Sequence, residues 1–404
     1  MQQALRRLIY FENPTRYQWL IYFGFFALLH VPAVLHHEGV NAYLLYANSL
    51  LKGHISLEAD NYDFLDMIFY NGKHYLPYPP FPSLVLLPFA AIFGPNVNTI
   101  FIALICSCAN LYLLYRILQR LEISKAIKSL LIPAFFFGTG YWYVLVTSHH
   151  VYQFAHIIAT TLVLLCINEI LGKQRWWLVG ILIGCSFLTR QFTLFYGVFA
   201  LGYLYYISKD NLDGTFYRKA ISLCGAIGVF VGLYLGYNYV RFGQPLNAGY
   251  NYIDYAGILK DRVATYGVFS PKYFWFNFYS LFFKGFTIVM SGADQMRIVD
   301  VDLWGTSLTA ASPFLIASVK ANWPKQLLWF AWITILIMLC GILFYHNNGF
   351  SQVNCMRFTL DFLPLLFVLT ALGADKIPLW LLRIMVVYAC ILNVAAFIIH
   401  YMAK

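Results

Sequence analysis

The composition of this 404-residue chain excludes a water-soluble globular protein. Hydrophobic residues make up 61% of the sequence and charged residues only 11%, whereas soluble domains are about half apolar and about a quarter charged. The net charge of +10 comes mostly from Lys and Arg in short loops between apolar runs. The positive-inside rule of membrane proteins explains this distribution, so it does not indicate nucleic-acid binding.

Apolar runs of about 20 residues recur along the chain, and this length predicts an all-α bundle of transmembrane helices rather than a barrel of alternating strands. Most of the eight cysteines lie inside these runs and form neither a disulfide framework nor a zinc pattern. No phosphate-binding loop or Gly-rich dinucleotide turn is present, so the sequence predicts no nucleotide-sugar domain. We expect residues 1–404 to form one integral-membrane domain.

The N-terminal third predicts a cytoplasmic tail, one span and a long outer loop. The basic tail, residues 1–17, places the start of the first span (about 18–36) in the cytoplasm. Residues 37–98 then form the first extracytoplasmic loop. Within it, 81–94 is too short to cross and contains Pro88, which predicts a re-entrant or interfacial helix.

The rest of the chain alternates apolar runs with short polar loops. Residues 177–208 are long enough for two short spans that turn near Arg190. Residues 241–304 form a second extracytoplasmic region, whose aromatic segment at about 274–290 is predicted to be an interfacial helix or, alternatively, a buried span. The other predicted spans lie at about 99–117, 129–147, 151–171, 219–240, 305–319, 327–346, 358–374 and from 377 to the C-terminus. About eleven transmembrane helices result.

The polar stretch from His36 to Pro80 concentrates carboxylates in a chain that has few. A carboxylate at membrane depth costs about 2.5 to 3.5 kcal/mol on insertion scales, so such groups are seldom retained without a role. Glu38 lies just beyond the first span, Asp66 lies shortly before the segment YNGKHY, and Asp63 lies one helical turn before Asp66. This loop is the candidate active site, and a carboxylate in it is suited to activate an acceptor hydroxyl.

Two segments of this loop resemble a known family. HHEGVNAYLLYANSLLKG resembles the start of the first outer loop in GT-C glycosyltransferases, the family of the aminoarabinose and protein O-mannosyl transferases, where an Asp-Glu pair leads into a short helix. NGKHYLPYPPFPSLVLLPFAAIFG resembles their Lys-Pro-Pro or His-Pro-Pro segment, which an apolar helix follows. RFGQPLNAGY and MRFTLDFLPLLFVL look like elements of bacterial members. The chain departs from the pattern at His37, where the family has Asp, and at Tyr78, where it has Lys or His.

The resemblance implies a GT-C-like fold and a sugar transfer from a polyprenyl-phosphate donor, with inversion by direct displacement. It places the site on the extracytoplasmic face, in a bacterial inner membrane, and the acceptor is a lipid, a glycan or a protein. Glu38 then occupies the acidic dyad and is the first candidate base, with Asp66 and Asp63 as alternatives. His37, Tyr75 and Tyr78 suit a wall for the isoprenoid or the sugar.

Basic side chains near the outer face are candidates for the donor phosphate. Arg190 interrupts an apolar stretch, where an unpaired guanidinium is expensive, and Arg matches phosphate oxygens bidentately. Arg357 is placed similarly, but Asp361 follows four residues later on the same face of a helix, so an internal ion pair is the alternative. Further candidates are Lys73, His149 and His150. The two histidines could also hold a divalent metal ion with the first loop.

Two other classes of protein fit the composition. A secondary transporter is expected to show paired repeats and ionisable groups near the midplane, whereas the polar residues here collect at one face. A polyprenyl-lipid-binding scaffold without activity remains an alternative because His37 replaces an acidic residue of the family.

Overall fold

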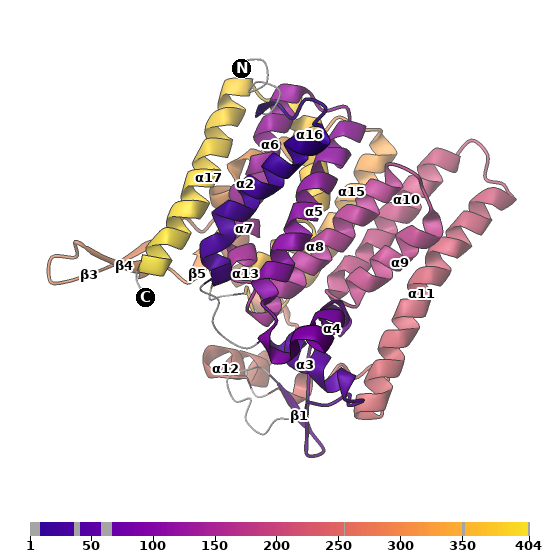
Figure 1. Cartoon of the computed structure of the whole chain (residues 1–404), viewed down its shortest axis with the longest axis vertical. Coiled ribbons are helices and arrows are strands. Elements are labelled where there is room, and N and C mark those ends of the chain that lie inside the picture. Colours follow the sequence, from indigo (N-terminus) through magenta and orange to yellow (C-terminus); the bar gives the residue numbers. More distant parts are fainter. Residues whose placement is uncertain (1–8, 36–40, 58–66, 254, 350–351, 403–404) are drawn as a thin grey trace.

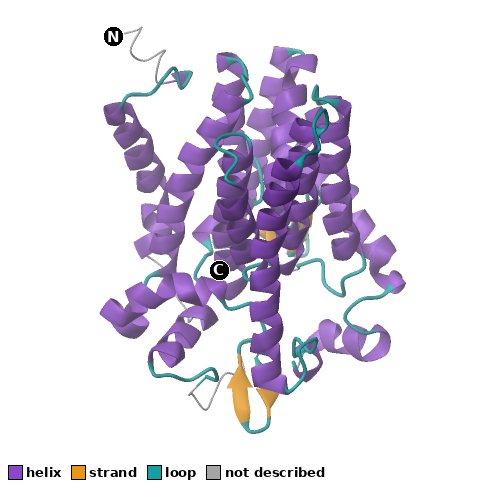
Figure 2. Ribbon diagram, turned by 90° about the vertical axis from the view of Figure 1, so that its right-hand side faces the viewer, coloured by secondary structure: helices purple, strands orange, loops and turns teal. Residues whose placement is uncertain are grey.

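Long helices packed side by side form the body of the protein (Figures 1 and 2). The computed structural model describes residues 9–35, 41–57, 67–253, 255–349 and 352–402. Within this part, six helices are long and apolar enough to cross a membrane: α2 (Arg16–Leu35), α5 (Thr99–Arg120), α8 (Val151–Ile170), α11 (Gly214–Phe242), α15 (Lys325–Leu343) and α17 (Leu379–Met402). The helical membrane class is confirmed, while the count of about eleven spans is not.

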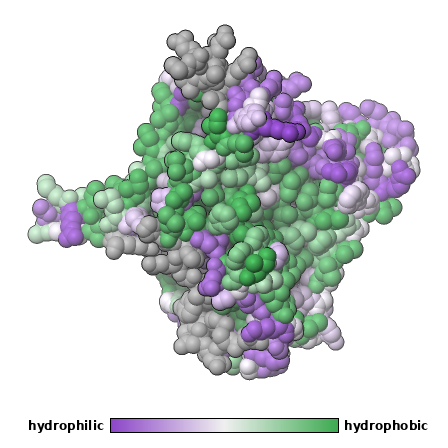
Figure 3. Space-filling model, in the orientation of Figure 1, coloured by the Kyte–Doolittle hydropathy of each residue, from purple (hydrophilic) through white to green (hydrophobic). Residues whose placement is uncertain are grey.

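A band of apolar side chains crosses the middle of the molecule, and hydrophilic side chains gather above and below it (Figure 3). Shorter helices complete the bundle and its lower end: α3 (Ala42–Leu51), α4 (Phe81–Phe93), α6 (Lys125–Phe137), α7 (Tyr141–Val146), α9 (Trp176–Phe187), α10 (Tyr196–Ser208), α12 (Gly257–Tyr266), α13 (Phe274–Phe282), α14 (Leu308–Ala311) and α16 (Leu363–Gly373). Seven 3₁₀ turns join the described helices: η1 (Gly94–Asn96), η2 (Gln191–Phe195), η3 (Tyr250–Tyr252), η4 (Pro271–Tyr273), η5 (Pro313–Lys320), η6 (Arg357–Asp361) and η7 (Ala374–Lys376).

The span predicted at 129–147 is broken into α6 and α7 at Gly138. A Cβ atom at Gly138 would lie only 3.2 Å from the Phe314 ring, so another part of the chain packs directly on the break. The Ser312 hydroxyl donates to the Gly138 carbonyl at 2.7 Å. Neighbouring elements therefore satisfy the backbone group that the break leaves without a helical partner.

The two short helices predicted within 177–208 are present as α9 and α10, and the chain turns between them near Arg190. In contrast, the span predicted at 305–319 is wrong. Ser312 leaves helical geometry at φ −141°, and Pro313, which has no N–H, starts η5 instead. The aromatic segment 274–290 forms only the nine-residue α13 before β3 (Ile288–Ser291) begins.

The structure is mostly helical, as predicted, and in the described part of the chain three small two-stranded sheets accompany the helices. In the described part, β1 (Ile68–Tyr70) and β2 (Lys73–Tyr75) form a hairpin through Asn71 and Gly72, which both have positive φ as a two-residue turn requires. A second hairpin pairs β3 with β4 (Arg297–Val301) and projects from the body of the molecule (Figure 1). The third sheet pairs β5 (Trp304–Thr306) with β6 (Gln352–Cys355) in parallel and so brings two distant segments together.

Candidate anion-binding site

A cavity of about 190 Å³ lies where the segments that follow α3, α11 and α15 meet the helical body. Its walls come from α3, α8, η2, η3, η6 and the segment after α15, and most of the side chains are tyrosine, phenylalanine or aliphatic residues. Arg190 and Arg357 both line it, and the described lining contains no carboxylate. The cavity is therefore an aromatic chamber that presents two guanidinium groups.

The broken helix between α9 and α10 positions Arg190. The Arg190 amide donates to the Ser186 carbonyl at 2.7 Å, and the Thr193 hydroxyl donates to the Arg190 carbonyl at 2.7 Å. The Ser186 hydroxyl in turn donates to Thr193 Oγ1 at 2.7 Å. These bonds satisfy the irregular backbone at the point where it lines a cavity, which is where such backbone is tolerated in membrane proteins.

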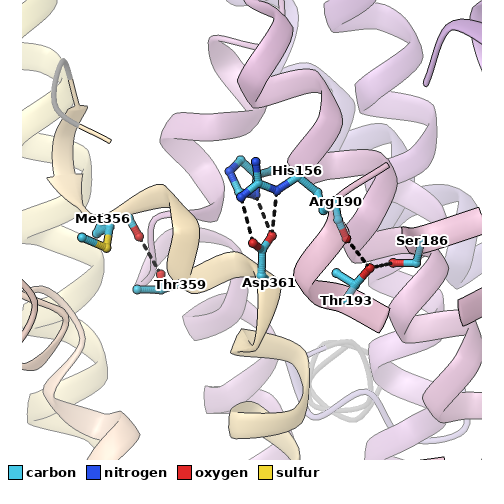
Figure 4. A network of polar contacts seen from close by, with 7 residues as sticks. All are labelled: His156, Ser186, Arg190, Thr193, Met356, Thr359 and Asp361. Carbon is cyan, nitrogen blue, oxygen red and sulfur yellow. Dashed lines mark hydrogen bonds and ion pairs between the residues drawn. The ribbon is translucent and has the colours of Figure 1, made fainter. Parts of the chain in front are cut away.

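Arg190 is not isolated, because both oxygens of the Asp361 carboxylate accept hydrogen bonds from its guanidinium (Figure 4). Nε donates to Oδ1 at 3.0 Å and Nη2 donates to Oδ2 at 2.8 Å. The predicted alternative pair of Arg357 with Asp361 is wrong. These residues lie in the 3₁₀ turn η6, which has about three residues per turn, so positions four apart point in different directions.

Arg357 approaches the same chamber from η6. Its side chain is buried, and Nη1 donates to the Gly349 carbonyl at 2.7 Å. Gly349 has φ +72°, and a Cβ there would lie 3.2 Å from Arg357 Nη1, so this contact favours glycine. The Arg357 guanidinium lies 5.1 Å from the Phe358 ring centroid, and that of Arg190 lies 5.3 Å from the same centroid. One ring thus faces two cations.

His156 on α8 completes the polar cluster behind Arg190. Its Nδ1 lies 3.3 Å from Asp361 Oδ1, and both side chains are fully buried. In Figure 4 the Asp361 carboxylate faces the imidazole and the guanidinium together. The sequence-based predictions omit His156, although a histidine within the apolar run of a membrane span is itself a signal of a polar contact.

The predicted wall residue Tyr78 does line the cavity, and its hydroxyl donates to the Tyr152 hydroxyl at 2.7 Å. Two bonds fix the segment that carries it. Arg241 Nη1 donates to the Leu76 carbonyl at 2.7 Å, and the Phe81 amide donates to the Leu188 carbonyl at 2.9 Å. The second bond ties the start of α4 to the end of α9, beside Arg190.

Other predicted site residues do not line the cavity. Lys73 is exposed on β2, and Tyr75 packs with Ile68, Phe242 and Ile253 in a separate apolar cluster. His149 and His150 lie between α7 and α8, where the Asn41 side chain donates to the His149 carbonyl at 3.1 Å. Four predicted residues lie outside the described part of the chain: His37, Glu38, Asp63 and Asp66.

Side chains suited to a metal ion do not gather in the part of the chain that the structure describes, where no group of three His, Cys, Asp or Glu residues is found. The possible divalent ion at His149 and His150 therefore has no ligand set among these residues. The remaining members of that predicted set lie in the first outer loop, outside the described residues. The described site is built from cations and aromatic rings.

Comparison with known proteins supports the family resemblance. The model of the dolichyl-phosphate-mannose-protein mannosyltransferase family matches residues 78–235, a segment that includes Tyr78, His156 and Arg190. The crystal structure of ArnT from Cupriavidus metallidurans, bound to undecaprenyl phosphate, has a similar fold with a TM-score of 0.52 and 13% sequence identity. The chain is thus similar to GT-C membrane glycosyltransferases, in sequence over residues 78–235 and in its fold.

The chain spans only part of the length of this structural relative. The similarity to ArnT covers 90% of this chain but 61% of that protein, and at 13% identity it establishes the fold alone. No curated protein sequence matches. A fold does not fix an activity, so the proposed activity rests on the chemistry of the cavity.

Proposed function

We propose that the protein transfers a sugar from a polyprenyl-phosphate donor to a lipid, glycan or protein acceptor. The observation that carries the proposal is the placement of Arg190 and Arg357 beside Phe358 in an aromatic cavity. Two largely buried guanidinium groups so close to one ring favour an anion between them, and guanidinium matches phosphate oxygens bidentately. The tyrosine and phenylalanine side chains suit the isoprenoid and the sugar.

In this reaction the two arginines hold the phosphate that leaves from the anomeric carbon. Negative charge grows on that phosphate as the glycosidic bond breaks, so cations fixed beside it lower the barrier. The match of residues 78–235 to the mannosyltransferase family model supports this assignment, and ArnT, which has a similar fold, was crystallised with undecaprenyl phosphate bound.

A variant pair at Arg190 tests the phosphate site. Arg190→Ala should weaken polyprenyl-phosphate binding, and Arg190→Lys should restore only part of it, because an ammonium cannot make the two-pronged contact. Intrinsic fluorescence titration of the purified protein with polyprenyl phosphate measures both. Arg116→Ala, at the other end of α5 from the outer loops, is the matched control. Unchanged binding in Arg190→Ala and in Arg357→Ala would contradict the proposal.

We propose Glu38 as the base that activates the acceptor hydroxyl, with Asp66 as the alternative and Asp63 as a third candidate. An amide keeps the shape and removes the charge, so Glu38→Gln should lower kcat about 10²-fold or more and leave lipid binding nearly intact. If Asp66→Asn is inactive while Glu38→Gln is active, Asp66 is the base. Full activity in both variants would contradict an acid–base mechanism in this loop.

The remaining assignments stay part of the proposal. Tyr78 is the first wall residue for the isoprenoid or the sugar, and His37 and Tyr75 of the same loop are further candidates for this wall. Lys73, His149 and His150 are further candidates for phosphate contacts. Alanine variants at these positions should lower lipid affinity less than Arg190→Ala does. Effects as large as that of Arg190→Ala would contradict the assignment of Arg190 as the main phosphate contact.

We also propose that the cavity opens to the extracytoplasmic side of a bacterial inner membrane, because the basic loops lie between the other helix ends. Cysteine introduced at Lys125 or Asp213 should react with a membrane-impermeant reagent only from the cytoplasm. Cysteine at Asn71 or Asn347 should react only from outside. Labelling of Asp213→Cys from outside would reverse the orientation.

A further inference from the structure

Asp361 is fully buried and lies behind Arg190 rather than in the cavity wall. Both carboxylate oxygens accept a hydrogen bond from Arg190, whose side chain keeps 20% of its surface exposed. A carboxylate in this place cannot touch a ligand in the cavity without displacing the guanidinium. Any effect of Asp361 on a ligand must therefore act through Arg190.

The two bonds hold the guanidinium against the carboxylate at two points. They use the donor on Nε and one donor on Nη2, and leave both donors on Nη1 and the second on Nη2 for other partners. A free arginine side chain has several rotatable bonds, whereas a planar fork held at two points is already oriented before a ligand arrives. This is how a binding group is preorganised.

His156 lies against the carboxylate from a third direction. Its Nδ1 lies 3.3 Å from Oδ1, the oxygen that also accepts from Arg190 Nε. His156 comes from α8, Arg190 from the break before η2, and Asp361 from η6. Three elements that are distant in sequence thus converge on one carboxylate, and this convergence fixes the direction of the Arg190 side chain (Figure 4).

We propose that Asp361 and His156 are positioning residues that orient Arg190 toward the phosphate of the lipid donor. The inference rests on the proposed function, since it takes a lipid phosphate as the ligand of Arg190. Neither residue contacts the ligand. His156 keeps Asp361 in place, Asp361 keeps the guanidinium in place, and the donors on Nη1 meet the phosphate.

A double-mutant cycle on polyprenyl-phosphate binding tests this chain of contacts. Asp361→Asn should raise Kd about tenfold when Arg190 is present, but less than about twofold in the Arg190→Ala background, because residues in one network are not additive. Equal effects in the two backgrounds would show that Asp361 acts only through the fold, and would overturn the proposal. Normal binding by Asp361→Asn would overturn it as well.

His156 supplies a second set of variants in case Asp361→Asn does not fold. His156→Asn keeps an N–H near the position of Nδ1, so it should bind nearly as the parent does, whereas His156→Leu should bind several-fold more weakly. This difference should again disappear in the Arg190→Ala background. Equal binding by His156→Asn and His156→Leu would overturn the role of His156.

Glu169→Gln is the matched control, because it breaks another bidentate pair of this chain, with Arg175, away from the cavity. It should leave Kd unchanged. The cycle also distinguishes a failure of the proposed phosphate site from a failure of the positioning role. Normal binding by Arg190→Ala would refute the proposed phosphate site and the positioning role with it. Weak binding by Arg190→Ala together with normal binding by Asp361→Asn would refute only the positioning role.

Discussion

Two arginine–carboxylate pairs in this protein have nearly the same geometry and different surroundings. Arg175 Nε and Nη2 each donate to the Glu169 carboxylate at 2.9 Å. Arg190 Nε and Nη2 donate to Asp361 at 3.0 and 2.8 Å. The Arg175 side chain is 46% exposed, whereas that of Arg190 is 20% exposed and Asp361 is fully buried.

The difference in surroundings separates a pair that closes a local corner from a pair that lies beside a cavity. Glu169 also accepts from the Arg175 amide at 3.0 Å, so this local pair closes the corner between α8 and α9. The pair of Arg190 with Asp361 joins residues 171 positions apart and aims a cation into a cavity. The hydrogen-bond distances alone do not distinguish the two pairs. The burial of the side chains and the neighbouring cavity distinguish them.

The largest expected contrast is in stability. Asp361→Ala leaves a largely buried guanidinium without its carboxylate and should lower the free energy of unfolding by about 3 to 5 kcal/mol. Glu169→Ala leaves Arg175 half-exposed to solvent, so the loss should be about 1 kcal/mol or less. Thermal unfolding in the same detergent measures both variants. Equal losses would show that the two pairs do not differ in burial as described.

A second contrast concerns the pH dependence of stability at His346, a residue that lines the cavity. Burial, together with the nearby Arg262, lowers the pKa of His346 to about 4, while an unfolded chain has a histidine pKa of about 6.5. Between these values the unfolded state binds more protons, so acidification destabilises the folded protein. His346→Gln should remove a loss of about 2 kcal/mol between pH 7 and pH 5.

Unfolding measured at both pH values checks this expectation. His54→Gln, which replaces an exposed histidine, is the control and should follow the parent. The same pH dependence in His346→Gln and in the parent would contradict a neutral buried His346.

The smallest expected effect is at the aromatic wall. Tyr78→Phe removes the hydroxyl that donates to Tyr152 and should cost about 0.5 to 1.5 kcal/mol of stability or ligand affinity. Tyr217→Phe, at an exposed tyrosine outside the cavity lining, should leave ligand affinity unchanged. If the two variants bind polyprenyl phosphate equally well, the Tyr78 hydroxyl has no part in shaping the wall.

The pattern of apolar residues along the chain was sufficient to predict the membrane class and the positions of the long helices. The six helices of spanning length agree with predicted apolar runs, from α2 to α17, because hydropathy is a local property that each run carries within itself. The sequence also predicted the turn at Arg190, where a charged residue interrupts an apolar stretch.

The pairing of the charged side chains depends on how distant segments pack in three dimensions. The sequence placed Asp361 with Arg357 through helical spacing, but η6 has a different pitch and Asp361 meets Arg190. The break at Gly138 and the contact of His156 with Asp361 likewise depend on segments that are far apart in the chain. Such pairings follow from how the helices pack, and hydropathy along the chain carries no information about that.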